Sequence, residues 1–206
     1  MNLAVFGATG GVGQELVKQA LAQGHRVTAF VRDPRRLAVQ DERLCVISGD
    51  VLNFNQAAQA VAVQEAVLVA LGSRARGKSS VRAEGTANVI RAMELHGARR
   101  LVVISAGGVG DSYRQVPLPI RLVIRTLWRE SYADHEAQEG HVRQSGLDWV
   151  IVRPAQLTGG PATGRFRPGN AQDGLPLGKV SRADTAEFAL AQIHSDRYLR
   201  QAVSIP

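Results

Sequence analysis

The sequence predicts an α/β fold in which a doubly wound parallel β-sheet is covered by helices on both faces. Short apolar runs alternate with segments of helical periodicity along the chain. Several of these runs are wholly apolar, as in parallel strands that are buried on both faces. A glycine-rich turn, GATGGVG, directly follows the first run, Asn2–Phe6. The length of 206 residues suits a single domain over residues 1–206.

The glycine turn leads into a helical pattern, so strand, turn and helix follow in the order that a nucleotide diphosphate site requires. Gly7 permits the tight turn, Gly10 lets the backbone approach a phosphate, and Gly13 lets the helix pack close to the sheet. The start of the helix offers free N–H groups to an anion, and Thr9 adds a hydroxyl donor. The alternative is an ordinary strand–helix turn without a ligand. The residues expected to contact a dinucleotide here are Gly7, Thr9, Gly10, Gly11, Val12 and Gly13.

The residues after the second predicted strand, Arg26–Val31, indicate which dinucleotide is bound. In dinucleotide-binding folds an acid at this strand end suits a free ribose 2′-hydroxyl, whereas an arginine suits a 2′-phosphate. Arg32 comes first here, and Arg36 follows closely. A charge-assisted contact of arginine with phosphate contributes roughly 1.5–3 kcal/mol, which is about ten- to hundredfold selection. We therefore expect NADPH or NADP⁺ rather than NADH, with a solvated basic loop as the alternative.

The third strand is predicted over Leu44–Ser48, and a short helix follows around residues 55–63. Cys45 lies within this apolar run, so we expect it to be buried as a small hydrophobic residue. As the single cysteine it excludes a disulfide framework, and we expect no metal centre. Asp50 closes the strand and is expected either to reach the adenine or to cap the next turn.

The fourth strand, residues 66–71, is wholly apolar and is followed by a second nucleotide-like motif. Residues 72–79 (GSRARGKS) match the P-loop pattern, and a helix is predicted over Val81–His96. The doubly wound topology explains the loop in another way, because the fourth strand then lies beside the first. Gly72 and Arg74 would in that case line the same crevice and face the cofactor.

The fifth strand, residues 101–105, ends at Ser105. Because ligands bind beyond the carboxyl ends of such strands, we expect Ser105 near the nicotinamide, where its hydroxyl can bond substrate or cofactor. The alternative is a turn serine. Residues 107–119 are rich in Gly and Pro and predict a mobile loop, and helices are predicted over residues 120–132 and 135–145.

The last third of the chain predicts a sixth strand over residues 148–153, which Pro154 ends. Residues 158–178 are dense in Gly and Pro without a clear period, which is typical of a binding flap. We expect loops 106–119 and 155–178 to form the substrate side. Ser181 is a plausible N-cap of a last helix, and a final strand is predicted near residues 202–205.

The charge balance favours a small anionic ligand over nucleic acid. Lys and Arg number 25 against 18 Asp and Glu, but the basic residues are scattered and form no long run. No signal peptide is visible and no apolar run reaches transmembrane length, so we expect no membrane partner and a cytoplasmic location.

Several motifs together resemble the atypical short-chain dehydrogenase/reductases, the NmrA-like NAD(P)-binding group with a Rossmann-like fold. They are GATGGVG, VRDP after the second strand, GDV, ALGS, VISA and SGLDWVIVRP. Within the group the chain is most similar to the flavin reductase and biliverdin-IXβ reductase branch. The shared pieces are VRDP-x-x-L, the Leu-Gly-Ser-Arg turn, Glu84-Gly85, Asp134-His135 ahead of Ser-Gly-Leu, and a Pro-rich flap after RPA.

This resemblance implies a set of cofactor-binding residues and a substrate-side polar residue, Ser105. The branch commonly places a histidine near the tetrapyrrole where this chain has Gln156, which favours flavin over biliverdin as the acceptor. We assign Ala106 and Gln156 to the substrate. The residues implied to hold NADPH are Gly7, Thr9, Gly10, Gly13, Arg32, Asp50, Val51, Leu71, Gly72 and Arg74, to which we add Gly11, Val12, Arg36, Ser105 and Pro154.

The Tyr-x-x-x-Lys dyad of ordinary dehydrogenases is missing, because Pro117 follows Tyr113 and Glu136 follows Tyr132 at that spacing. A tyrosine with an ordinary pKa near 10 is a poor base at neutral pH. Carbonyl chemistry is therefore disfavoured, whereas hydride transfer to a conjugated flavin or tetrapyrrole depends mainly on orientation. His135 could serve as an acid, although a histidine on a helix surface is more often structural.

The sequence thus favours an NADPH-dependent reductase of a flavin or a biliverdin-like acceptor. The alternatives are a non-catalytic NADP(H)-sensing regulatory module that works through a protein partner, a quinone-directed or epimerase-like enzyme, and a P-loop enzyme.

Overall fold

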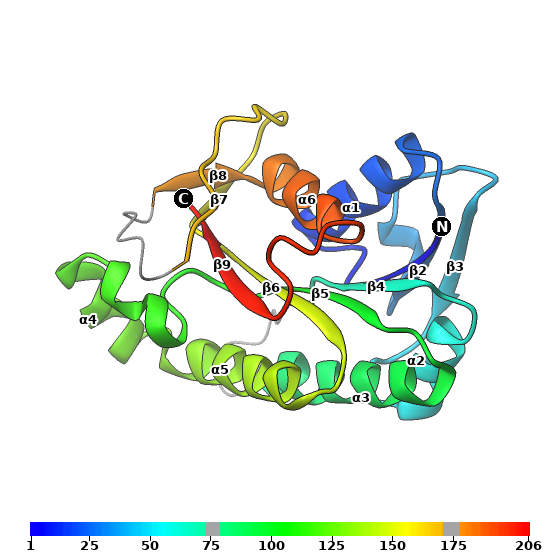
Figure 1. The fold of residues 1–206 in the computed structure, drawn as a ribbon, viewed down its shortest axis with the longest axis horizontal. Coiled ribbons are helices and arrows are strands. Elements are labelled where there is room, and N and C mark those ends of the chain that lie inside the picture. Colours follow the sequence, from blue (N-terminus) through cyan, green and yellow to red (C-terminus); the bar gives the residue numbers. More distant parts are fainter. Residues whose placement is uncertain (73–78, 171–177) are drawn as a thin grey trace.

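The computed structural model describes residues 1–72, 79–170 and 178–206. A seven-stranded parallel sheet in the order β3-β2-β1-β4-β5-β6-β9 forms the middle layer, and helices cover both of its faces (Figure 1). Helices α1 and α6 pack against each other on one face, and α2, α3 and α5 follow one another on the other. The predicted doubly wound α/β fold is therefore confirmed.

The sheet and its helices occupy most of the described chain. The strands of the sheet are β1 (Asn2–Phe6), β2 (Arg26–Val31), β3 (Leu44–Ser48), β4 (Ala66–Val69), β5 (Arg100–Ile104), β6 (Asp148–Pro154) and β9 (Gln201–Ile205). The helices are α1 (Gly11–Ala22), α2 (Phe54–Val61), α3 (Val81–His96), α4 (Leu118–Thr126), α5 (Arg129–Gln144) and α6 (Arg182–Ala191). The structure gives β1, β2, β3 and α3 the bounds that the sequence predicts.

Strand β1 lies in the middle of the sheet, between β2 and β4. The chain first builds β2 and β3 on one side of β1 and then crosses to β4, β5 and β6 on the other. The predicted pairing of the first and fourth strands is confirmed. Ligands of such sheets bind where the strand order reverses, beyond the carboxyl ends of the strands, which here is the end of β1 and β4.

Burial of β1 on both faces explains why its sequence is wholly apolar. Leu3 and Val5 belong to the core beneath α1 and α6, whereas Ala4 and Phe6 belong to the core beneath α2 and α3. None of the four side chains has exposed surface. Successive side chains of a strand point to opposite faces, so a strand between two helical layers has no polar side.

The glycine turn after β1 is possible only without side chains at two positions. Gly7 has a φ of +82°, and a Cβ there would lie 2.3 Å from the carbonyl oxygen of Ala70. A Cβ on Gly13 would lie 2.1 Å from the carbonyl oxygen of Gly7. The start of α1 therefore packs directly on the turn and next to the end of β4.

The predicted division between the helices after β5 is wrong. The sequence suggested helices over residues 120–132 and 135–145, but α4 ends at Thr126 and α5 runs unbroken from Arg129. Tertiary contacts explain the difference, because the carboxylate of Asp134 accepts hydrogen bonds from the backbone N–H groups of Arg82 and Ala83 at the start of α3. Asp134 is thus fixed in the middle of α5 by packing against α3.

The two predicted substrate-side loops, 106–119 and 155–178, contain more regular structure than expected. The first holds a 3₁₀ helix, η2 (Gly110–Gln115), and the start of α4. Two short strands that the sequence did not predict, β7 (Gln156–Thr158) and β8 (Lys179–Ser181), pair in parallel at the ends of the flap. Strands of this length leave no periodicity to detect.

The expectation that Cys45 is buried is also wrong, since the structure exposes it. The cause is the position of β3, which is the outermost strand at its end of the sheet. Among the helices that the structure describes, none is long and apolar enough to span a membrane.

We expect Gly13→Ala to lower the free energy of unfolding by about 1–3 kcal/mol or more, because the added methyl group overlaps backbone that cannot move independently. Gly140→Ala is the matched control. Gly140 lies inside α5, and a methyl group added there would meet no atom within 4 Å beyond the helix's own backbone, so the change should stabilise by about 0.5–1 kcal/mol. Urea unfolding followed by circular dichroism compares the three proteins, and an unchanged midpoint for Gly13→Ala would contradict the close approach.

Candidate functional site

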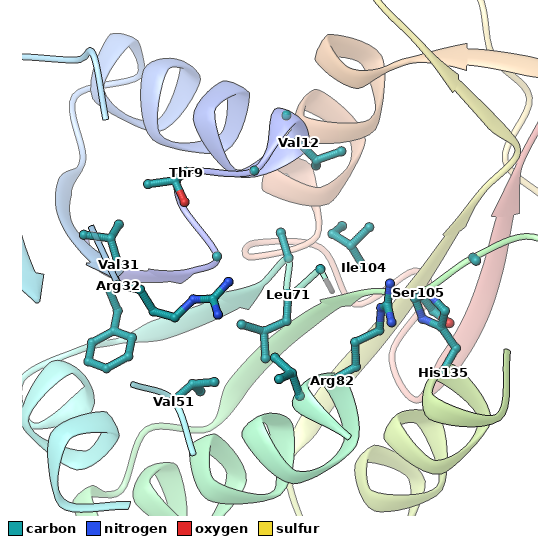
Figure 2. A pocket seen from close by; sticks show the side chains of 18 of the residues that line it. Thr9, Val12, Val31, Arg32, Val51, Leu71, Arg82, Ile104, Ser105 and His135 are labelled. Carbon is teal, nitrogen blue, oxygen red and sulfur yellow. The ribbon is translucent and has the colours of Figure 1, made fainter. Parts of the chain in front are cut away.

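A cavity of about 490 Å³ opens beyond the carboxyl ends of the central strands. Its walls come from the glycine turn, the segments after β2, β3, β4, β5 and β6, the start of α3, His135 of α5, and the first residue of α6. Figure 2 shows Thr9 and Arg32 toward the left of the view and Ser105 and His135 toward the right. The cavity therefore occupies the place where sheets of this topology bind ligands.

The start of α1 forms the wall nearest the glycine turn. Its N-cap, Gly10, provides no side-chain hydrogen bond, and the first turn holds no acidic residue. The free N–H groups and the positive end of the helix dipole therefore favour an anion. Five of the six predicted turn residues line the cavity: Gly7, Thr9, Gly10, Gly11 and Val12. Gly13 is not among the lining residues, and it serves the packing of α1 instead.

Two arginines after β2, Arg32 and Arg36, also line the cavity. Figure 2 shows the Arg32 side chain extending into it. Between them Arg35 pairs with Asp33, whose carboxylate oxygen lies 2.9 Å from Nε of Arg35. Hydrogen bonding to Arg35 lowers the pKa of the Asp33 carboxyl. Because Asp33 is occupied in this way, Arg32 and Arg36 have no acidic partner among the described ion pairs and remain available to a ligand.

Arg182 is a further cation that the sequence analysis did not assign to the site. It is the first residue of α6, whose N-cap Ser181 accepts a hydrogen bond from the backbone N–H of Asp184 at 2.9 Å. The Arg182 side chain lies across Gly11, where a Cβ would stand 2.5 Å from its Cδ. It lines the cavity beside the start of α1. The sequence marked this segment only as a helix start, and nothing in it indicated that α6 packs beside α1.

The segments after β3 and β4 complete the half of the cavity next to the glycine turn. Asp50, Val51, Leu71 and Gly72 all line it, as expected. Of the two roles predicted for Asp50, the structure shows the turn cap, because its Oδ1 accepts from the backbone N–H of Leu52 at 3.0 Å. Arg74 and most of the P-loop-like motif lie at residues 73–78, outside the described residues.

The other half of the cavity begins at the end of β5. Ser105, Ala106 and Pro154 line it, as predicted. Ser105 is buried, and its hydroxyl donates to Oε1 of Glu139 at 2.7 Å. Gln156 is exposed and does not line the cavity, whereas its neighbours Ala155 and Leu157 do. The alternation along β7 explains why the side chain expected to meet the substrate points away.

Glu139 is held by a buried arginine. Arg153 donates from Nε to Oε1 of Glu139 at 2.9 Å and from Nη2 to Oε2 at 2.7 Å. Arg153 also pairs with Asp111 in η2. Arg153 is only 1% exposed. Its bidentate pair with Glu139 therefore fixes the carboxylate that accepts the hydrogen bond from the Ser105 hydroxyl.

His135 is buried in the cavity wall, so its expected position on a helix surface is wrong. Burial, together with the charge of Arg82, lowers the pKa of His135 to about 4. Its Nδ1 lies 3.3 Å from Oε1 of Gln138, whose amide nitrogen donates to the Thr86 hydroxyl at 3.0 Å. A neutral imidazole at neutral pH is a poor proton donor, so the structure argues against His135 as an acid.

Arg82 is the second arginine of the cavity lining that the sequence analysis did not assign to the site. It lies in the first turn of α3, lines the cavity and is 9% exposed. Its Nη1 donates to Oδ2 of Asp134 at 3.1 Å. A cation in the first turn opposes the helix dipole, which is the one sign in the sequence that Arg82 has a special role.

The hydroxyl of Tyr132, a tyrosine that could have acted as a base, is already hydrogen-bonded within the protein. The hydroxyl of Tyr132 donates to the carbonyl oxygen of Gly107 at 3.0 Å, and burial raises its pKa. Both effects disfavour ionisation, in agreement with the missing Tyr-x-x-x-Lys dyad.

Comparison with known proteins places these features in a family context. A family model described as NAD(P)H-binding matches residues 7–196. The photosystem II assembly factor Ycf39 of Synechocystis is 26% identical over the whole chain, which spans 62% of that protein. The 3-diazoavenalumate denitrifying reductase of a Streptomyces species is 28% identical over 99% of this chain and 71% of its own. The crystal structure of ChuY, an anaerobilin reductase from Escherichia coli O157:H7, has a TM-score of 0.83 and 25% identity and covers 100% of this chain and 96% of its own.

The lowered pKa of His135 predicts a loss of stability in mild acid. The unfolded chain takes up a proton near pH 6.5 and the folded chain only near pH 4, so the free energy of unfolding should fall as the pH falls through this window. The contribution of His135 is of the order of 3 kcal/mol. We expect the free energy of unfolding of His135→Gln, measured with urea between pH 7 and 4, to lack this fall. His141→Gln, on the exposed side of α5, is the control and should follow the wild type. Parallel curves for wild type and His135→Gln would contradict the assignment.

Proposed function

Since the chain belongs to the NAD(P)H-binding family, we propose that it is an NADPH-dependent reductase that transfers a hydride to a flavin or a biliverdin-like conjugated acceptor. The observation that carries the proposal is the uncapped start of α1, which faces the cavity and is flanked by arginines without a described acidic partner. The names of two similar proteins, ChuY and the Streptomyces enzyme, support a reductase.

The residues present fit a dinucleotide. The absence of side chains at Gly7 and Gly13 lets the turn pack against backbone, and Gly10 and Gly11 line the cavity without side chains. In the proposed function the first N–H groups of α1 and Arg182 bind the diphosphate, and Arg32 and Arg36 bind the 2′-phosphate. When it is bound, the reduced nicotinamide supplies the hydride.

The described residues around Ser105 suit a reaction that needs orientation more than acid–base catalysis. Ile104, Ala106, Pro154 and Leu157 form apolar walls that can exclude water from a flat acceptor. His135 is neutral, and the Tyr132 hydroxyl is bound to a carbonyl group. Proton uptake by the reduced acceptor is therefore left to solvent, which a conjugated ring system permits.

Cofactor selection tests the phosphate contacts. We expect Arg32→Ala and Arg36→Ala each to weaken NADPH binding about ten- to hundredfold and to leave NADH binding nearly unchanged, since only NADPH carries the 2′-phosphate. Arg182→Ala should weaken both cofactors by similar factors, because the diphosphate is common to them. Isothermal titration calorimetry measures the six dissociation constants and those of the wild type.

Two exposed basic residues are matched controls for these variants. Arg26→Ala removes an exposed arginine at the opposite end of β2, outside the cavity lining, and Lys179→Ala removes an exposed charge three residues before Arg182. Both should leave the affinities within about twofold. Equal affinity of the wild type for NADPH and NADH would overturn the proposed role of Arg32 and Arg36, and no heat with either cofactor would overturn the proposed function.

Turnover tests the reductase itself. We expect NADPH oxidation with FMN, riboflavin or biliverdin as acceptor, and a rate about ten times lower for Ser105→Ala, which loses one hydrogen bond at the reacting end. Absorbance at the nicotinamide band measures the rate. Tight NADPH binding without turnover of any flavin, bilin or quinone would reject the reductase and favour the alternative of an NADP(H)-sensing module.

A further inference from the structure

Three polar side chains, Arg82, Ser105 and His135, meet at the half of the cavity beyond β5, which we call the Ser105 end (Figure 2). The other side chains that the structure describes there are apolar, such as Ile104, Pro154 and Leu157 in the cavity lining. A ligand at this end must therefore satisfy these three groups. Each of them has its hydrogen-bonding role fixed by a buried partner outside the cavity.

Ser105 can only accept a hydrogen bond from a ligand. A carboxylate has no hydrogen to give, and both oxygens of Glu139 already accept hydrogen bonds from Arg153. The hydrogen of the Ser105 hydroxyl consequently points to Oε1 of Glu139, 2.7 Å away. The lone pairs of the hydroxyl remain for the cavity. Ser105 therefore cannot polarise a carbonyl group of the acceptor.

His135 can likewise only accept. The amide nitrogen of Gln138 donates to Thr86, so the amide oxygen faces Nδ1 of His135. Nδ1 carries the hydrogen of the neutral ring in this arrangement, and Nε2 keeps a lone pair. Burial and the neighbouring Arg82 keep the ring neutral.

Arg82 is the donor among the described side chains of this end. Its guanidinium has five N–H groups, of which Nη1 is bound to Asp134. The Arg82 side chain is nine-tenths buried, so water cannot readily replace a missing partner. Its Nε is buried and has no hydrogen-bond partner among the described residues. A buried cation with unused donors is costly unless a ligand group completes it. Figure 2 shows the side chain extending from α3 toward Ser105.

We propose that Arg82 binds a carbonyl oxygen of a cyclic amide on the hydride acceptor, and that Ser105 or His135 accepts the N–H of the same amide. The inference rests on the proposed reductase function and narrows its substrate to lactams and imides conjugated with the reacting atom. A flavin imide and a bilin lactam each place a carbonyl beside an N–H. A quinone has carbonyl oxygens only, which would face the lone pairs of Ser105 and His135.

The same contact acts on the reaction. The hydride brings an electron pair into the conjugated acceptor, whose new C–H or N–H bond forms as the C–H bond of the reduced nicotinamide breaks. The negative charge that the acceptor gains is delocalised onto the amide oxygen, and solvent then supplies a proton. In the proposed binding mode the guanidinium of Arg82 lies beside the oxygen on which that charge develops, and it therefore lowers the barrier as well as binding the ring.

Ligand binding tests the polarity of the Ser105 end without turnover. Protein saturated with NADP⁺ is titrated in a calorimeter with lumiflavin, with 3-methyllumiflavin, which lacks the imide N–H, and with menadione, a quinone. We expect lumiflavin to bind at least about tenfold more tightly than either of the others, which corresponds to one hydrogen bond. Equal affinities, or no binding of lumiflavin to a protein that binds NADP⁺, would overturn the inference. Failure to bind NADP⁺ would instead overturn the proposed function.

Variants test Arg82 itself. Arg82→Met alone would leave the buried Asp134 unpaired, so it is combined with Asp134→Asn, and Arg82→Lys keeps the charge with fewer donors. Arg91→Met changes an exposed arginine of the same helix as the control. We expect the double variant to lose about 100-fold in single-turnover hydride transfer to lumiflavin, with NADP⁺ affinity within about twofold of the wild type. The rate of hydride transfer in Arg82→Lys should lie between those of the wild type and the double variant. A wild-type rate in the double variant would overturn the inference.

Discussion

The close approach of α1 to the ends of β1 and β4 is the constraint on which the site depends. With hydrogen atoms in place of side chains at Gly7 and Gly13, the turn lies against the backbone of Ala70 and the helix begins directly on the turn. The first N–H groups of α1 therefore open into the cavity instead of onto neighbouring backbone. A turn with side chains at these positions would lift the helix away and remove the anion site together with the sheet packing.

A second buried interaction organises the opposite half of the cavity. The pair of Arg153 and Glu139 joins β6 to α5, and its contact with Asp111 reaches the segment after β5. Ser105, at the end of β5, completes this arrangement through its hydroxyl. A buried ion pair contributes little net stability, because both charges lose their hydration. Its value here lies in fixing the direction of one hydroxyl group at the place where the proposed acceptor binds.

The sequence predicted those parts of the fold and the site that depend on local pattern. Wholly apolar runs located the central strands, and the glycine spacing located the turn, because both follow from burial and backbone geometry within one segment. Arg182 and Arg82 were missed because each meets the cavity through a contact between distant segments, with Gly11 and with Asp134 respectively. Gln156 and Cys45 were misplaced for a related reason, since strand alternation and the edge of the sheet decide their exposure.

The distribution of cations along the cavity agrees with two different electrostatic tasks. Arg32, Arg36 and Arg182 have no described acidic partner, which suits the permanent charges of phosphate groups. Arg82 is instead tied to Asp134, so much of its charge is balanced before any ligand arrives. A fully unpaired cation there would bind an anionic ground state tightly and gain nothing in the transition state. A partly neutralised guanidinium with spare N–H groups suits a neutral carbonyl that becomes negative during the reaction, which is the behaviour of a conjugated amide receiving a hydride.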